Sequence, residues 1–201
     1  MPRGKCTITI LISIVLTMGY FLPARGTTIQ RFSFTRLGQS APVIVVARCI
    51  TQTTEQDPGT RSIYTRSTFS VQEVLKGHAD ATITLRMPGG QFEGRRSMMH
   101  GVPDFHPGDE AVLFLTQQDT RGFPWVMGLS QGCFRIFRDP QSGTALVRYA
   151  VSDTELVDPT TGRVLQKPAT PPPPELLETF KQRLSRILDH RPETPAGKDR
   201  P

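Results

Sequence analysis

Cysteine is scarce in this chain. The 201 residues include three cysteines, and Cys6 lies in an apolar N-terminal segment that we do not expect in the folded domain. Only Cys49 and Cys133 could pair in the folded protein, so a scaffold held by several disulfides is excluded. Two alternatives stay open for this pair: a single disulfide, or two separate thiols packed as small apolar side chains.

Aromatic residues and excess positive charge are also limited. Aromatic residues make up 7% of the chain, and its net charge of +6 falls to +3 (21 basic against 18 acidic residues) beyond residue 26. Barrels that bind single-stranded nucleic acid combine a basic groove with stacking aromatic side chains. The basic residues available for such a patch are Lys76, Arg86, Arg95 and Arg96. We interpret them as parts of a solvated surface and expect no nucleic-acid partner.

A long, almost uncharged apolar run occurs at residues 7–21. Two basic residues precede it, and Ala24 and Gly26 supply small side chains at positions −3 and −1 of a cleavage site. This layout predicts a secretory signal peptide over residues 1–26, cleaved to leave a chain that starts at Thr27. The alternative is an uncleaved anchor, because the run is near the lower limit of about 17 residues for a membrane-spanning helix. We expect a secreted or periplasmic protein with no membrane attachment after cleavage.

The middle of the chain shows short strand patterns separated by turns. Strands are expected at 42–50, 63–75, 81–87, 110–116, 124–129, 133–137 and 145–151, with 124–129 and 133–137 forming a hairpin. Between Val71 and Val74 the apolar phase slips by one residue, which predicts a bulge. Residues 91–109 are interpreted as a long polar connection. The pattern predicts an all-β domain over residues 27–151, built as a closed or nearly closed barrel of about five to seven strands.

The ends of this domain carry appendages. A short helix is expected to begin near Ser33. Residues 152–174 are interpreted as a small hairpin followed by a stiff proline-rich linker, and 191–201 as a disordered tail. Between them, residues 175–190 form an amphipathic helix pattern. We expect its apolar stripe, Leu177, Phe180, Leu184 and Ile187, to dock on the barrel, although a partner could also bind it.

Several motifs together carry a resemblance. They are Ile63-Tyr64-Thr65, the segments 73–77 and 105–115, Pro88-Gly89-Gly90, and the segment 131–136. Over residues 37–150 the chain resembles a group of uncharacterised exported bacterial proteins. Their fold is similar to the netrin-like domain, an OB-type barrel shared with the tissue inhibitors of metalloproteinases. The resemblance implies a binding domain, with an exported protease as one kind of partner. The inhibitors' own mechanism uses an N-terminal cysteine, whereas this chain is expected to start at Thr27.

One motif could indicate a serine hydrolase. Residues 128–132 match the Gly-x-Ser-x-Gly pattern, in which the serine sits between a strand and a helix whose N terminus helps to stabilise an oxyanion. The segment after Ser130 has the pattern of a strand, and the histidine downstream, His190, lies beyond the proline-rich linker. We therefore favour a turn over a nucleophile.

A second cluster could indicate a metal site. His100, Asp104 and His106 lie in one loop region, close to Asp109 and Glu110, and such side chains can bind zinc or another divalent ion. Their spacing matches no named site, so a structured loop is the preferred interpretation. The sequence thus predicts an exported, non-enzymatic binding domain without a cofactor, acting on another exported protein. The alternative is a small serine hydrolase or a metal-dependent enzyme that uses Ser130 or the loop with His100 and His106.

Overall fold

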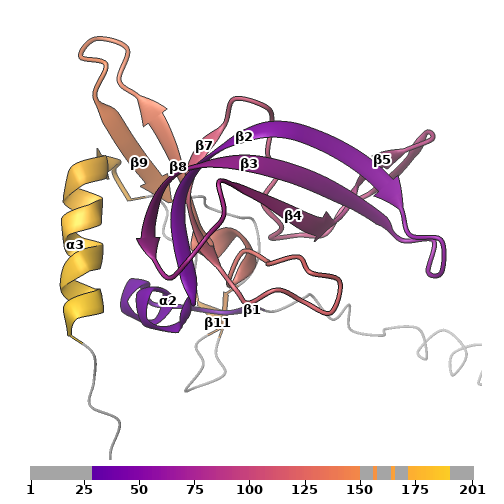
Figure 1. Ribbon diagram of the computed structural model, residues 1–201, viewed down its shortest axis with the longest axis horizontal. Helices are drawn as coiled ribbons and strands as arrows, with labels where there is room; N and C mark the ends of the chain where they lie inside the picture. The colour runs from indigo at the N-terminus through magenta and orange to yellow at the C-terminus, as the bar shows by residue number, and fades with distance from the viewer. Residues whose placement is uncertain (1–28, 150–155, 158–163, 166–171, 191–201) are drawn as a thin grey trace, which may run out of the picture.

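The computed structural model describes residues 29–149, 156–157, 164–165 and 172–190, and its main feature is one bent antiparallel sheet of seven strands (Figure 1). In spatial order the strands are β12 (Glu175–Leu176), β9 (Ala145–Tyr149), β8 (Cys133–Arg138), β7 (Glu110–Leu115), β2 (Val43–Gln56), β3 (Ile63–Lys76) and β4 (Thr82–Pro88). Two small sheets accompany it, β1 (Ile29–Gln30) with β10 (Leu156–Val157) and β11 (Val164–Leu165), and β5 (Gly90–Phe92) with β6 (Arg95–Ser97). The predicted all-β class with a C-terminal helix is confirmed.

The sheet is not a closed barrel, so that part of the prediction was wrong. Among the described residues β4 pairs only with β3 and β12 only with β9, which leaves the two edges of the sheet unjoined. Curvature comes instead from irregularities in the pairing of β2 with β3. The register leaves Gln72 and Leu75 of β3 and Ile50 of β2 without partners. The predicted phase slip between Val71 and Val74 is confirmed by the extra Gln72, and such bulges bend a strand.

The two faces of the sheet have separate cores. On β7, Ala111, Leu113 and Leu115 face one core, and Val112 and Phe114 face the other, because successive side chains on a strand alternate. Loop residues cover the first core, with the Phe105 ring 4.9 Å from the Phe69 ring. Two helices cover the second core: α2 (Phe34–Ser40) and α3 (Leu177–Asp189).

The C-terminal helix docks on the sheet, as its apolar stripe predicts. Phe180 and Leu184 are fully buried, and Gly38 of α2 lets the side chains of Leu184 and Ile187 approach closely. The helix begins at Leu177, two residues later than predicted, because Glu175 and Leu176 pair with β9 as the edge strand β12. The helix α2 begins after Ser33 as expected, and the Ser33 hydroxyl accepts a hydrogen bond from Arg36 N–H.

Three predictions of local structure were wrong. β2 continues to Gln56, since its threonine-rich second half pairs with β3, and threonine suits a strand. The polar connection 91–109 contains the β5–β6 hairpin. The segments 124–129 and 133–137 do not form a hairpin with each other. Val126 forms an isolated bridge with Leu115 of β7, and Cys133 of β8 pairs with Leu113 of the same strand.

Much of the predicted N-terminal and linker structure lies outside the described residues. The signal segment 1–26, the linker part 166–171 and the tail 191–201 belong to it. β10 and β11 pair as an antiparallel ladder, as the small predicted hairpin requires. No helix in the described part of the chain is long and apolar enough to span a membrane.

Candidate functional site

The serine of the Gly-x-Ser-x-Gly motif lies in a single 3₁₀ turn, Leu129–Gly132. An isolated bridge between Val126 and Leu115 of β7 precedes this turn, and the strand β8 follows it directly, so no helix begins directly after Ser130. Ser130 is buried, and its hydroxyl forms no hydrogen bond with any residue that the structure describes. Gly132 is required by the turn, since a Cβ there would clash with the Met127 carbonyl oxygen. The geometry is that of a tight turn that leads into a strand, and not that of a nucleophile elbow.

The residue next to this serine has a structural role that the sequence did not reveal. The buried Gln131 accepts a hydrogen bond from Phe32 N–H through Oε1 (2.8 Å) and donates from Nε2 to the Gln30 carbonyl (2.9 Å). A side-chain amide offers one acceptor and two donors, so it can pair with a backbone strand as another strand would. The motif therefore ties the N-terminal segment to the end of β7.

The histidine loop is held by an arginine and not by a metal-like arrangement. His106 lies 3.9 Å from the carboxylates of both Asp104 and Asp109; the side chains of His106 and Asp104 are largely solvent-accessible, and that of Asp109 is partly buried. Arg135 of β8 donates to Asp109 at 2.5 Å and to the Asp104 carbonyl, and it stacks over the Phe105 ring at 4.7 Å. His100 lies in an exposed turn. Within the described ranges, no three His, Cys, Asp or Glu side chains converge as metal ligands would.

The two cysteines are free, buried thiols. Cys49 lies opposite Asp109 and Cys133 opposite Leu113, so the strand β7 separates them and they are also offset along it. Two strand spacings alone amount to about 9.5 Å, more than the Cα separation of about 7 Å that a disulfide can span. Of the two alternatives for the pair, the structure contains separate thiols. Burial raises the pKa of Cys133 to about 12 and also raises that of Cys49.

The four basic residues considered as a patch do not form one surface. Lys76 donates to the Gly38 and Gln39 carbonyls at the end of α2. Arg86 is buried, donates to Glu55 (2.6 Å) and Asp57 (3.2 Å), and stacks on the Tyr64 ring at 3.6 Å. The interpretation of these two residues as solvated was therefore wrong. Both serve to hold the fold.

Asp57 is the centre of this ion network, at the turn between β2 and β3. Hydrogen bonds from the Arg121 guanidinium and from Thr60 N–H hold the pKa of its carboxyl well below the usual range. The Arg86 guanidinium also donates to it. A carboxylate that accepts several such bonds is stabilised in its charged form. The network therefore fixes the distal end of the β2–β3 hairpin.

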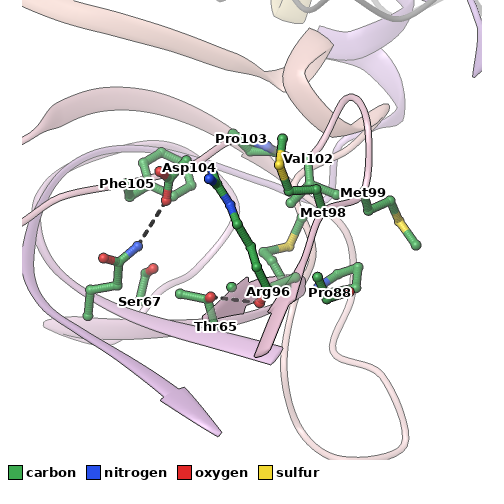
Figure 2. Close-up of a pocket in the computed structure, with 15 residues that line it drawn as sticks. Thr65, Ser67, Pro88, Arg96, Met98, Met99, Val102, Pro103, Asp104 and Phe105 are labelled. Atoms are coloured by element: carbon green, nitrogen blue, oxygen red, sulfur yellow. Dashed lines mark hydrogen bonds between the residues drawn. The ribbon is translucent and has the colours of Figure 1, made fainter. Parts of the chain in front are cut away.

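A groove of about 180 Å³ opens where the first core ends, at that same distal end of the sheet. Its floor consists of Gln52 of β2, Thr65 and Ser67 of β3, and Met87 of β4. Cross-strand pairing explains the floor, because Gln52 is paired with Ser67, and Thr65 is paired with Met87. The residues 96–99 of the β5–β6 hairpin form one wall, and the residues 102–105 form the other (Figure 2). The hairpin that begins with β5 and the helix α3 lie at opposite ends of the long strands β2 and β3 (Figure 1).

The hairpin wall rests directly on the floor. Gly90 of β5 has φ +127°, and a Cβ there would clash with Thr65 Oγ1 and lie 2.7 Å from Thr54 Cγ2. The Thr65 hydroxyl donates to the Gly89 carbonyl (2.8 Å), which ties the start of the hairpin to β3. Only glycine allows a backbone to approach so closely in this conformation.

Some polar groups of the groove are paired and others are not. Gln52 donates from Nε2 to Asp104 Oδ1 (3.0 Å) and so joins the floor to the opposite wall. Ser67 is 3% exposed, and its hydroxyl has no hydrogen-bond partner among the described residues. Arg96 likewise makes no ion pair or hydrogen bond through its guanidinium within that part of the chain. Leaving a buried polar group unpaired costs about 1–3 kcal/mol, so a ligand atom that accepted a hydrogen bond from the Ser67 hydroxyl would recover this free energy.

Exposed apolar side chains border the same groove. Met98 is 69% exposed and Met99 is 50% exposed, and both line it. Pro88 and the partly buried Val102 add further apolar surface, whereas the Phe105 ring is fully buried. Methionine is unbranched and polarisable, and it is common on surfaces that adapt to varied partners. The groove thus joins unpaired polar groups to an exposed, adaptable apolar rim.

Two residues of the groove were already candidates from the sequence, although the groove itself was not predicted. Asp104 entered as a candidate metal ligand and Arg96 as part of a basic patch, and the structure brings both to the groove. The partners first expected for them, His100 and Lys76, do not line it. Comparison of the chain with family models, with curated proteins and with solved structures found no match. The netrin-like resemblance therefore stays a prediction.

Proposed function

We propose that this chain is an exported, non-enzymatic binding protein whose groove receives a segment of another exported protein. The signal pattern of residues 1–26 supports export. Neither the Ser130 turn nor the His106 loop supports an alternative enzyme, because the described residues supply Ser130 with no base and the loop with no set of metal ligands.

The observation that carries the proposal is the coincidence of three features at one groove. The groove is lined by the buried hydroxyl of Ser67 and the cation of Arg96, which have no partners within the described ranges, and by two exposed methionines. Apolar side chains at a surface depression, combined with a few polar groups that fix orientation, are typical of binding sites. Exposed apolar surface rimmed by polar groups also marks sites of protein contact.

The kind of partner is suggested by the fold resemblance. It implies an exported protease as one possible class. We place the contact of such an inhibitor at the groove and not at the N terminus, because no N-terminal cysteine is expected after cleavage at Gly26. The proposal therefore places the contact at the distal end of β2 and β3 and not at the chain's start.

Site-specific photo-crosslinking in the exporting cell tests this function. A photoreactive amino acid at Met99 is expected to give one discrete crosslinked species in the exported fraction. The matched control places the same group at Gln141, an exposed residue in the turn between β8 and β9, on the side of the molecule away from β5 (Figure 1). Equal crosslinking at both positions, or none at Met99, would contradict the proposed function.

A further inference from the structure

We infer that the groove recognises a carboxylate: the side chain of a glutamate or aspartate that is flanked by apolar residues in an extended segment of the partner. The inference rests on the proposed function and names the chemical group that the groove recognises. Its starting point is the arrangement of Arg96 and Ser67. One is a cation on the wall and the other a buried hydroxyl on the floor, and both lack partners among the described residues.

Both unpaired groups donate hydrogen bonds, and a carboxylate accepts them. A guanidinium carries five N–H donors and no acceptor, and it pairs well with the two oxygens of a carboxylate. The Ser67 hydroxyl can add a further donor from below. Figure 2 shows Thr65 and Ser67 under the Asp104 and Phe105 wall, with the Arg96 side chain extending across the space between the walls.

The charge of the groove favours a single negative charge over a phosphate. Arg96 lines the groove, whereas its neighbour Arg95 does not, because successive side chains of a strand point to opposite faces. Asp104 on the opposite wall is also negative, and it is exposed and already accepts from Gln52. A doubly charged group would be repelled by Asp104 with only one arginine to compensate. A carboxylate carries half that charge.

The placement of apolar groups favours an internal side chain over a chain terminus. In Figure 2, Phe105 lies on one side of Arg96, and Pro88 and Met99 lie on the other. Phe105 itself is buried, but the partly exposed Val102 lines the same wall, so apolar surface lies on both walls and suits a segment that continues in both directions from its acidic residue. The exposed Met98 and Met99 would contact the flanking apolar side chains.

Binding of blocked heptapeptides, measured by NMR titration of the protein from Thr27 onwards, tests the inference. The probes are N-acetylated and C-amidated, with Leu, Val, Phe or Met around a central Glu, and the matched set carries Gln at the centre. We expect the Glu set to bind at least about tenfold more tightly, because charge-assisted hydrogen bonds are roughly twice as strong as neutral ones. Arg96→Gln should remove that preference, and Ser67→Ala should reduce it.

Two variants serve as controls. Arg95→Gln changes the same charge on the same strand but outside the groove, so it should keep the Glu preference. Asp104→Asn removes the repulsive charge and should tighten binding of the Glu set. Equal binding of both sets, no binding of either, or weaker binding to Asp104→Asn would overturn the inference. If crosslinking at Met99 persisted in that case, the proposed function would stand and only the carboxylate would be rejected.

Discussion

The Phe180 ring of α3 packs against the Phe134 ring of β8, with their centroids 4.9 Å apart. This contact joins the C-terminal helix to the central sheet. Phe34 of α2 completes the cluster, 5.1 Å from Phe180. The C-terminal helix is thus part of the core of the domain and not an independent arm.

Phe180→Ala should lower the free energy of unfolding by about 3–5 kcal/mol, the usual cost of removing a large buried aromatic side chain. Urea denaturation measures it. Leu176→Ala, four residues earlier at a side chain that is 47% exposed, should cost much less, about 0.5 kcal/mol. Equal effects of the two changes would show that the helix does not dock through Phe180.

Gln131→Ala should destabilise the protein, because it leaves Phe32 N–H and the Gln30 carbonyl without their partner. Each unpaired buried group costs about 1–3 kcal/mol. Ser130→Ala removes a hydroxyl that pairs with no described residue, and it should change stability by less than about 0.5 kcal/mol. An esterase assay on the same pair checks the alternative function: turnover lost only in Ser130→Ala would contradict the binding proposal.

Acid should destabilise the distal end of the β2–β3 hairpin. The pKa values of Asp57 and Glu55 are both lowered in the folded state, mainly by hydrogen bonds from Arg121 and Arg86 respectively. Their contribution is therefore complete above their ordinary values of 3.8 and 4.5, and it is lost as pH falls below these towards the folded values. Stability measured from pH 6 to pH 2 should fall less steeply for Asp57→Asn than for the natural chain. An unchanged slope would show that Asp57 is not the titrating group.

Cys49 and Cys133 should resist alkylation at pH 8 in the folded protein that starts at Thr27. The thiolate is the reactive form, and burial raises both pKa values, that of Cys133 to about 12. Mass spectrometry after iodoacetamide should show no adduct without denaturant and two adducts in guanidinium chloride. A disulfide would instead require a reductant before either thiol reacted.

The strands were predictable because their residues carry local signals. The alternation from Ile63 to Val71 and the apolar run of β7 depend on neighbours in the sequence, and both describe faces that are buried. The β5–β6 hairpin was not predictable in this way. Arg95 and Arg96 are exposed, and the two strands pair only with each other, so no apolar pattern marks them.

The groove could not be assembled from the sequence for a related reason. Ser67 lies on the buried face of its strand, and only the three-dimensional structure shows that its hydroxyl has no partner among the described residues. Asp104 and Arg96 come from a loop and a hairpin whose positions are set by long-range contacts such as those of Arg135. Their spacing in the sequence instead grouped Asp104 with His100 and His106, and Arg96 with Lys76, Arg86 and Arg95.

The glycine at position 90 fixes how far Arg96 can reach. Because Gly90 has no side chain, the hairpin lies against Thr54 and Thr65, and the guanidinium is carried over the floor. Even a methyl group there would act as a spacer that lifts the hairpin from the sheet. If the groove binds the proposed carboxylate, its selectivity depends in part on a glycine that offers the ligand no polar group, and a substitution at position 90 would change the spacing of the groove without altering any of its polar groups.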